Sequence, residues 1–276
     1  KTRMEYSARN TTVALLSRLT AIAMGYLLRV VFTHTLSESY VGVNGLFVDI
    51  IQVLSLSEMG VGAAITFALY RPIAGGDKEK QKALMLLFRK FYRALAVIVA
   101  AVGSLLIPFL DVLIKDHGDV DRLTLIYMLY LVNTVCSYLL IYKKSLMDAN
   151  QLLYIGIFYQ TMSWALQDVL QIIVLVFWHN FIAFLLINIV TTVFCNVCIS
   201  IRADRLYPYL RENDAPALSV QERKKIFANI RAMLMHKVGA VIVNNTDNLL
   251  LSAFVGLASV GGYSNYYLLI GSVCQV

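Results

Sequence analysis

The residues best suited to chemistry in this chain are charges placed inside apolar runs. Arg18 and Arg29 lie in the first such run, at roughly 12–33. Eleven residues turn a helix about 20° past three full turns and rise about 16 Å, so both arginines share one face. Ile22 and Gly25 fall on the same stripe. This face predicts a cavity position for Arg18, whereas Arg29 is as easily explained by reaching the membrane surface.

Two later apolar runs carry polar side chains at the same steps of seven and eleven. The sets are Gln160, Gln167 and Gln171 in one run, and Lys237, Asn244 and Asn248 in the other. Together with Arg18, Gly25 and Arg29, these stripes predict a water-filled centre with substrate-binding side chains. The alternative is hydrogen bonding between packed helices.

Four acidic residues also lie in apolar runs: Asp49, Glu58, Asp168 and Asp247. They are candidates for sites of a coupling ion, Na⁺ or H⁺, or for structural partners of the arginines. Glu58 is level with Arg18 and is the favoured partner, whereas Asp49 is nine residues away and faces the opposite side of a regular helix. The sequence contains no nucleophile triad, metal-ligand set or phosphate-binding glycine loop. We therefore expect no enzyme, no bound metal and no cofactor.

The elements that must position these residues are membrane helices. The 276 residues are 59% hydrophobic and 15% charged, whereas soluble domains carry about 25% charged residues. Runs long enough to span a bilayer occur at roughly 12–33, 43–70, 92–114, 123–142, 152–178, 181–201 and 236–256, and an eighth begins near 263. The fold class predicted is an all-α, polytopic transmembrane helix bundle.

Basic residues predict the orientation of the bundle. With the N-terminus in the cytoplasm, nearly all loop cations fall on the inner side, and the outer segments hold only Lys115 and Arg122. Such an excess is typical of cytoplasmic loops. The net charge of +7 therefore indicates membrane topology rather than nucleic-acid binding. A multi-pass membrane protein with its N-terminus in the cytoplasm is expected.

The longest connection separates two predicted domains. Ser219 and Glu222 form a capping box, and the basic, amphipathic segment behind it predicts a helix on the inner membrane face. A short motif recurs on either side: residues 36–44 (LSESYVGVN) and 257–265 (LASVGGYSN) both contain Val-Gly followed by Asn. The domains predicted are a six-helix lobe at 1–203, a linker at 204–234 and the first helices of a pseudo-symmetric second lobe at 235–276. The chain is expected to be a fragment.

Two regions resemble the bacterial polysaccharide flippases of the multidrug/oligosaccharidyl-lipid/polysaccharide exporter superfamily. The first comprises residues 40–47 (YVGVNGLF), 54–64 (LSLSEMGVGAA) and 68–72 (ALYRP). The second comprises residues 246–252 (TDNLLLS), 256–257 (GL), 260–261 (VG) and 263–266 (YSNY). The resemblance implies a two-lobed transporter that moves an undecaprenyl-pyrophosphate-linked oligosaccharide to the outer leaflet by alternating access.

The partners this implies are the polyprenyl-pyrophosphate-linked glycan, membrane lipids, and the polymerase and glycosyltransferases of the same pathway. Arg18 and Arg29 fit the cationic cavity residues of that family. Three alternatives stay open: a drug/cation antiporter of the same superfamily, a membrane glycosyltransferase or polymerase, and a scaffold of a synthesis complex. The cations in the first apolar run count against the antiporter, because an antiporter of cationic drugs would have an acidic cavity.

Overall fold

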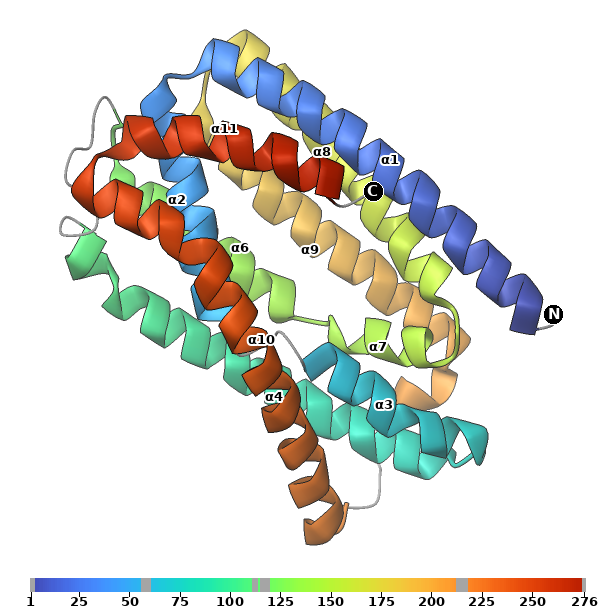
Figure 1. The fold of residues 1–276 in the computed structure, drawn as a ribbon. Helices are drawn as coiled ribbons and strands as arrows, with labels where there is room; N and C mark the ends of the chain where they lie inside the picture. Colours follow the sequence, from blue (N-terminus) through green and yellow to red (C-terminus); the bar gives the residue numbers. More distant parts are fainter. Residues whose placement is uncertain (1–2, 56–60, 111–113, 115–119, 212–217, 275–276) are drawn as a thin grey trace.

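The protein folds into a bundle of helices (Figure 1). The computed structural model describes residues 3–55, 61–110, 114, 120–211 and 218–274. Among these residues, 90% are helical and none lies in a strand. The helices are α1 (Arg3–Thr35), α2 (Glu38–Leu54), α3 (Val61–Ala74), α4 (Lys78–Leu105), η2 (Ile107–Phe109), α6 (Leu123–Tyr138), α7 (Tyr142–Ala149), α8 (Leu153–Trp178), α9 (Phe181–Leu206), η3 (Pro208–Arg211), α10 (Val220–Phe254) and α11 (Leu257–Cys274). The predicted all-helical fold is confirmed.

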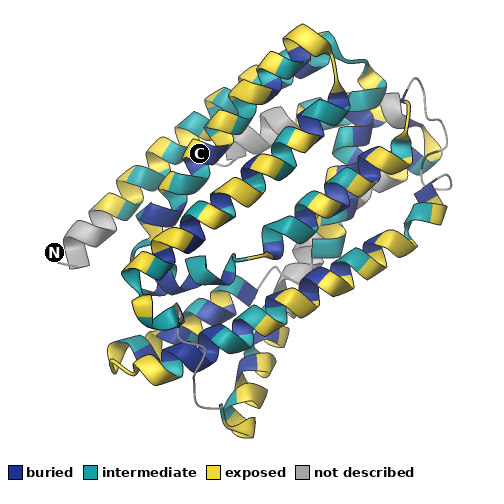
Figure 2. Ribbon diagram, turned by 180° about the vertical axis from the view of Figure 1, so that it is seen from behind, coloured by how far each residue is buried: buried dark blue, intermediate teal, exposed yellow. Residues whose placement is uncertain are grey.

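Helix length and surface composition make this a membrane-embedded protein. Within the described ranges, four helical segments are long and apolar enough to cross a bilayer: Arg9–Thr35, Lys78–Phe109, Leu153–Trp178 and Phe181–Leu206. Exposed residues run along the outer helices (Figure 2), and they include large apolar side chains such as Val97 (69% exposed), Leu105 (70%) and Val190 (66%). A water-soluble monomer rarely exposes so much contiguous apolar surface, whereas acyl chains cover it at no cost.

Two of the predicted spans contain more than one helix. The run at 43–70 contains α2, which ends at Leu54 with Ser55 as its C-cap, and α3, which begins at Val61. The run at 123–142 ends early, because Leu139 is extended and Leu140 adopts a φ of 70°. α6 and α7 are bent by 44° relative to each other, and together they are long and apolar enough to form a broken span or a re-entrant loop.

The predicted capping box begins a helix much longer than expected. The Ser219 hydroxyl accepts from the Glu222 N–H at 3.2 Å, and the Ser219 N–H donates to the Glu222 carboxylate at the same distance. The basic segment and the predicted seventh span are one helix, α10, which continues through residue 235. Its first turns pack beside α4, where Phe91 and Phe227 have ring centroids 6.0 Å apart and Lys80 donates to Glu222.

Glycines allow α11 to pack closely along α2, at the end of the bundle where α1 ends (Figure 1). A Cβ at Gly261 would lie 2.7 Å from the Glu38 carbonyl oxygen and 3.3 Å from the Gly42 nitrogen. One at Gly45 would lie 3.5 Å from the Cβ of Ser264. The two copies of the Val-Gly motif therefore pack against each other. We call this contact the α2–α11 crossing.

Candidate functional site

Arg18 lies in a cleft between α1 and α8, here called the α1–α8 cleft. Its volume is about 520 Å³, and it is lined from α1 by residues that include Ser17, Arg18 and Gly25. Gln160 and Trp164 line it from α8. Of the predicted site residues, the structure thus brings together Arg18, Gly25 and Gln160.

Polar contacts hold α1 against α8 along this cleft. The Ser17 and Thr161 hydroxyls are hydrogen bonded, and Thr161 also donates to the Ile157 carbonyl. Ser17 is therefore the donor of the pair. Nearer the start of α1, Asn10 donates to the Gln151 carbonyl at 3.1 Å and accepts from the Tyr154 N–H at 2.9 Å. These bonds fix which face of α1 is turned toward α8, and so where Arg18 lies.

Lys144 supplies a cation that sequence reasoning missed. Its ammonium donates to the Gln160 side-chain oxygen at 2.9 Å. Its stem lies over Gly156, where an added Cβ would be 3.1 Å from the Lys144 Cε. Positional counting treats Lys144, like its neighbour Lys143, as one of the loop cations that report orientation. The bend between α6 and α7 is the feature that turns Lys144 into the bundle.

The other two glutamines of the α8 stripe bond to α9. The Gln167 oxygen accepts from the Thr191 hydroxyl at 2.8 Å, and the Gln171 amide donates to the Phe184 carbonyl at 3.0 Å. Gln171 is only 1% exposed. The three glutamines share one face of α8, as predicted, but different helices pack against that face along its length. The geometry of Gln167 and Gln171 fits hydrogen bonding between packed helices.

Arg29 links α1 to α11. Its Nε donates to the Asn265 side-chain oxygen at 2.6 Å. Its Nη2 is buried and has no hydrogen-bond partner among the described residues. Nearby, the buried Tyr130 hydroxyl donates to the Asn44 side chain. Asn44 and Asn265 are the asparagines of the two motif copies, so that repeat was the sequence signal for Asn265.

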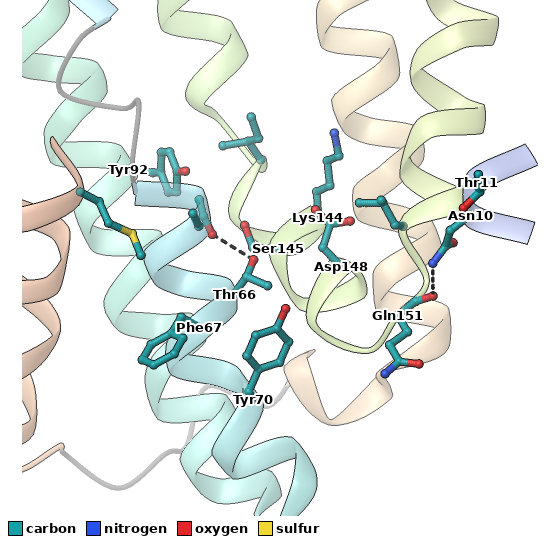
Figure 3. A pocket seen from close by; sticks show the side chains of 15 residues that line it. Asn10, Thr11, Thr66, Phe67, Tyr70, Tyr92, Lys144, Ser145, Asp148 and Gln151 are labelled. Atoms are coloured by element: carbon teal, nitrogen blue, oxygen red, sulfur yellow. Dashed lines mark hydrogen bonds between the residues drawn. The ribbon is translucent and has the colours of Figure 1, made fainter. Parts of the chain in front are cut away.

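A second cavity, of about 880 Å³, opens between α3 and α7 and is here called the α3–α7 cavity (Figure 3). Phe67 and Tyr70 line it from α3, and Ser145 and Asp148 line it from α7. Asn10 lines its edge from α1. None of these residues was a predicted site residue, because periodicity within an apolar run does not reveal a cavity formed by short and interrupted helices.

The acidic candidates are scattered. Asp49 is buried in α2, Asp168 is half-buried in α8, and exposed Asp247 accepts from the Tyr263 hydroxyl at 2.6 Å. Glu58, the expected partner of Arg18, lies outside the described residues, as do the side chains of Lys237, Asn244 and Asn248. Within the described part of the chain, the candidate site thus consists of the α1–α8 cleft, with Arg29 further along the same helix.

Comparisons with protein-family models, with curated proteins and with solved structures find no match for this chain.

Proposed function

We propose that this protein forms part of a flippase, which moves a polyprenyl-pyrophosphate-linked oligosaccharide from the inner to the outer leaflet by alternating access. The observation that carries the proposal is the α1–α8 cleft, which Arg18 and Gln160 both line within an apolar, membrane-embedded bundle. An anionic head group crossing a low-dielectric slab needs a compensating charge. Arginine is always charged, and its planar fork matches phosphate oxygens.

The proposed architecture is a pair of six-helix lobes in a bacterial plasma membrane, with the N-terminus in the cytoplasm. The mutual packing of the two Val-Gly motifs supports this arrangement, since two lobes related by a pseudo-two-fold axis would bring equivalent segments together. A lateral opening between the lobes would leave the lipid tail in the bilayer. Glycosyltransferases and a polymerase of the same pathway are the expected partners, and the coupling ion would be Na⁺ or H⁺.

Replacing Arg18 tests this function directly. In the full-length gene, Arg18→Ala is expected to stop export of the surface glycan while the protein still reaches the membrane. The measurement is surface glycan staining, normalised to membrane-inserted protein. Leu19→Ala is the matched control, because Leu19 is the next residue on α1 and is 61% exposed. Wild-type export by Arg18→Ala would remove Arg18 from the mechanism.

Chemical labelling tests whether water enters the α1–α8 cleft. A Cβ added at Gly25 meets no atom within 4 Å, so Gly25→Cys should fold normally. With the protein in lipid nanodiscs, where both membrane faces are accessible, we expect a water-soluble maleimide to label this cysteine and added pyrophosphate to slow the labelling. A cysteine at position 25 that never reacts would instead show that α1 and α8 close over this site.

A further inference from the structure

The α3–α7 cavity has a wall chemistry unlike that of the Arg18 cleft. Phe67 and Tyr70 are one helical turn apart on α3 and are 60% and 51% exposed, so two aromatic rings face the opening. Across the cavity, Ser145 and Asp148 lie on α7, and Gln151 follows (Figure 3). The volume of about 880 Å³ falls in the range of roughly 300–1,000 Å³ that small-molecule sites occupy.

The polar groups of this wall have spare hydrogen-bonding capacity. Within the described part of the chain, no residue bonds to the Tyr70 and Ser145 hydroxyls or to the Gln151 side-chain amide. The Asp148 Oδ1 is buried and has no partner there either. A buried acceptor without a partner is costly, so a ligand that donates a hydrogen bond to Asp148 would offset this cost.

The charges of the wall select the class of ligand. The Asp148 carboxylate would repel an anion. The Lys144 ammonium would attract one, but it already donates a hydrogen bond to Gln160. An organic cation would be drawn to Asp148 but repelled by Lys144, one helical turn away. A lipid chain would leave four polar groups without partners. A neutral ring rich in hydroxyl groups satisfies all of them, since hydroxyls both donate and accept and its C–H face packs on aromatic rings.

The cavity and the cleft adjoin along α1. Thr11 lines the cavity, and Arg18 lines the cleft. Seven residues separate them, which places both on one face of the helix, with a rise of about 10 Å. A sugar directly attached to a pyrophosphate spans a comparable length. One ligand could therefore extend from the cleft into the cavity, with its anionic part at Arg18 and its sugar entering the cavity beside Thr11.

We propose that the α3–α7 cavity is a binding site for uncharged sugar rings, in which Tyr70 and Phe67 stack on the ring and Asp148, Ser145 and Gln151 bind its hydroxyls. The inference deepens the proposed flippase function and rests on it for the identity of the cargo. The two sites bind different parts of one cargo: the α1–α8 cleft with Arg18 binds phosphate, and the α3–α7 cavity with Tyr70 binds sugar.

The test measures binding of separate parts of such a cargo to the full-length protein in lipid nanodiscs. The ligands are glucose and N-acetylglucosamine as neutral sugars, choline as an organic cation, and inorganic pyrophosphate as the anion. Saturation-transfer NMR detects sugar and choline binding, and calorimetry detects pyrophosphate binding. The variants are Tyr70→Ala, Asp148→Asn and Arg18→Ala. Phe177→Ala is the matched control, because Phe177 is an aromatic residue of α8 that is 72% exposed and lies outside the cavity.

We expect a neutral sugar to bind the wild type and the Phe177→Ala control equally. Tyr70→Ala removes a ring that stacks on the sugar and a hydroxyl, and Asp148→Asn replaces a charged acceptor with a neutral one, so each should weaken sugar binding about tenfold. Neither should change pyrophosphate binding. Arg18→Ala should have the opposite pattern. Tyr70 is half exposed, so its replacement should leave the fold intact, which circular dichroism checks.

Two results would overturn the inference. One is sugar binding that is absent, or unchanged by both Tyr70→Ala and Asp148→Asn. The other is choline binding that depends on Asp148 and displaces the sugar, which would assign the cavity to organic cations. If Arg18→Ala stops glycan export but no sugar binds, the flippase function stands and the sugar site falls. If sugar binding depends on Tyr70 but Arg18→Ala exports normally, the site stands and the proposed mechanism falls.

Discussion

The two ends of the bundle are built on different principles. Where α1 ends, α2 and α11 pack closely, because a Cβ at Gly261 would meet the α2 backbone and one at Gly45 would meet the Ser264 side chain. Where α1 begins, the long Lys144 side chain joins α7 to α8, and two cavities, of about 880 and 520 Å³, open beside these helices.

This difference fits a bundle that is closed at one end and open at the other. Glycine contacts bring helices together without polar partners, so they re-form whenever the helices meet in the right register. Polar contacts across a gap fix side-chain positions and leave room for a ligand. In the proposed orientation the closed end faces outward and the open end faces the cytoplasm, as expected for a transporter awaiting cargo.

The largest effect is expected from locking the closed end. The Cβ atoms of Gly45→Cys and Ser264→Cys would be about 3.5 Å apart, at the lower edge of the range that disulfides require. In a background with Cys136, Cys195, Cys198 and Cys274 replaced by Ser, oxidation should form the disulfide and stop glycan export. Reduction should restore it. Each single variant serves as a control, and full crosslinking with undiminished export would show that the crossing never opens.

Forcing the closed end apart should cost stability. Gly261→Val places a Cβ about 2.7 Å from the Glu38 carbonyl oxygen, and overpacking of this kind costs about 1–3 kcal/mol. We expect a lower thermal midpoint in detergent. Gly262→Ala is the neighbouring control, because its added Cβ meets no atom within 4 Å. Equal midpoints for both variants would mean that the crossing contributes nothing to stability.

The α8 glutamines test where the open region stops. Gln171→Ala should destabilise the protein by about 1–3 kcal/mol, since it removes the partner of a buried carbonyl, while export per folded molecule stays normal. Gln160→Ala should reduce export with a smaller change in thermal midpoint, because it frees Lys144 beside the cleft. The opposite results, a loss of export in Gln171→Ala and a larger loss of stability in Gln160→Ala, would indicate that the water-filled space lies nearer α9.

The smallest expected effect concerns pH at the start of α10. The Lys80 ammonium, together with the Ser219 hydroxyl and N–H, holds the pKa of the Glu222 carboxyl below its ordinary value. The stabilisation is therefore fully present above the ordinary glutamate pKa and is lost as the pH falls through the lowered one. Hydrogen exchange of the first α10 turns, relative to Glu222→Gln, should rise only in that acidic range. The effect is small, because water screens this exposed pair.

Local chemistry made much of the fold predictable. The Ser219–Glu222 capping box formed as its spacing indicated, and the 3.6-residue period placed Arg18 and Gly25 on the same cleft. The division of the run at 43–70 into α2 and α3 was not predicted, because mean hydropathy does not mark where a helix ends. The position of Lys144 inside the bundle was not predicted, because it depends on a bend at Leu140. Leu140 adopts a left-handed backbone conformation that its residue type does not indicate.

The identity of neighbours was the least predictable part. Gln160, Gln167 and Gln171 share a face by periodicity, yet the first bonds to α7 and the other two to α9. Periodicity gives the direction of a side chain but not which helix crosses there. Long-range packing decides whether a polar stripe lines water or joins two helices.

The packing of the Lys144 stem over Gly156 has a consequence for how such chains diverge. The Lys144 Cε would be 3.1 Å from a Cβ at position 156, so a long side chain at 144 favours glycine at 156. Related sequences should therefore change these two positions together. A lineage that replaced the lysine with a small residue would be released to place alanine or serine at 156. Covariation between 144 and 156 would thus record which descendants kept the second cation and which lost it.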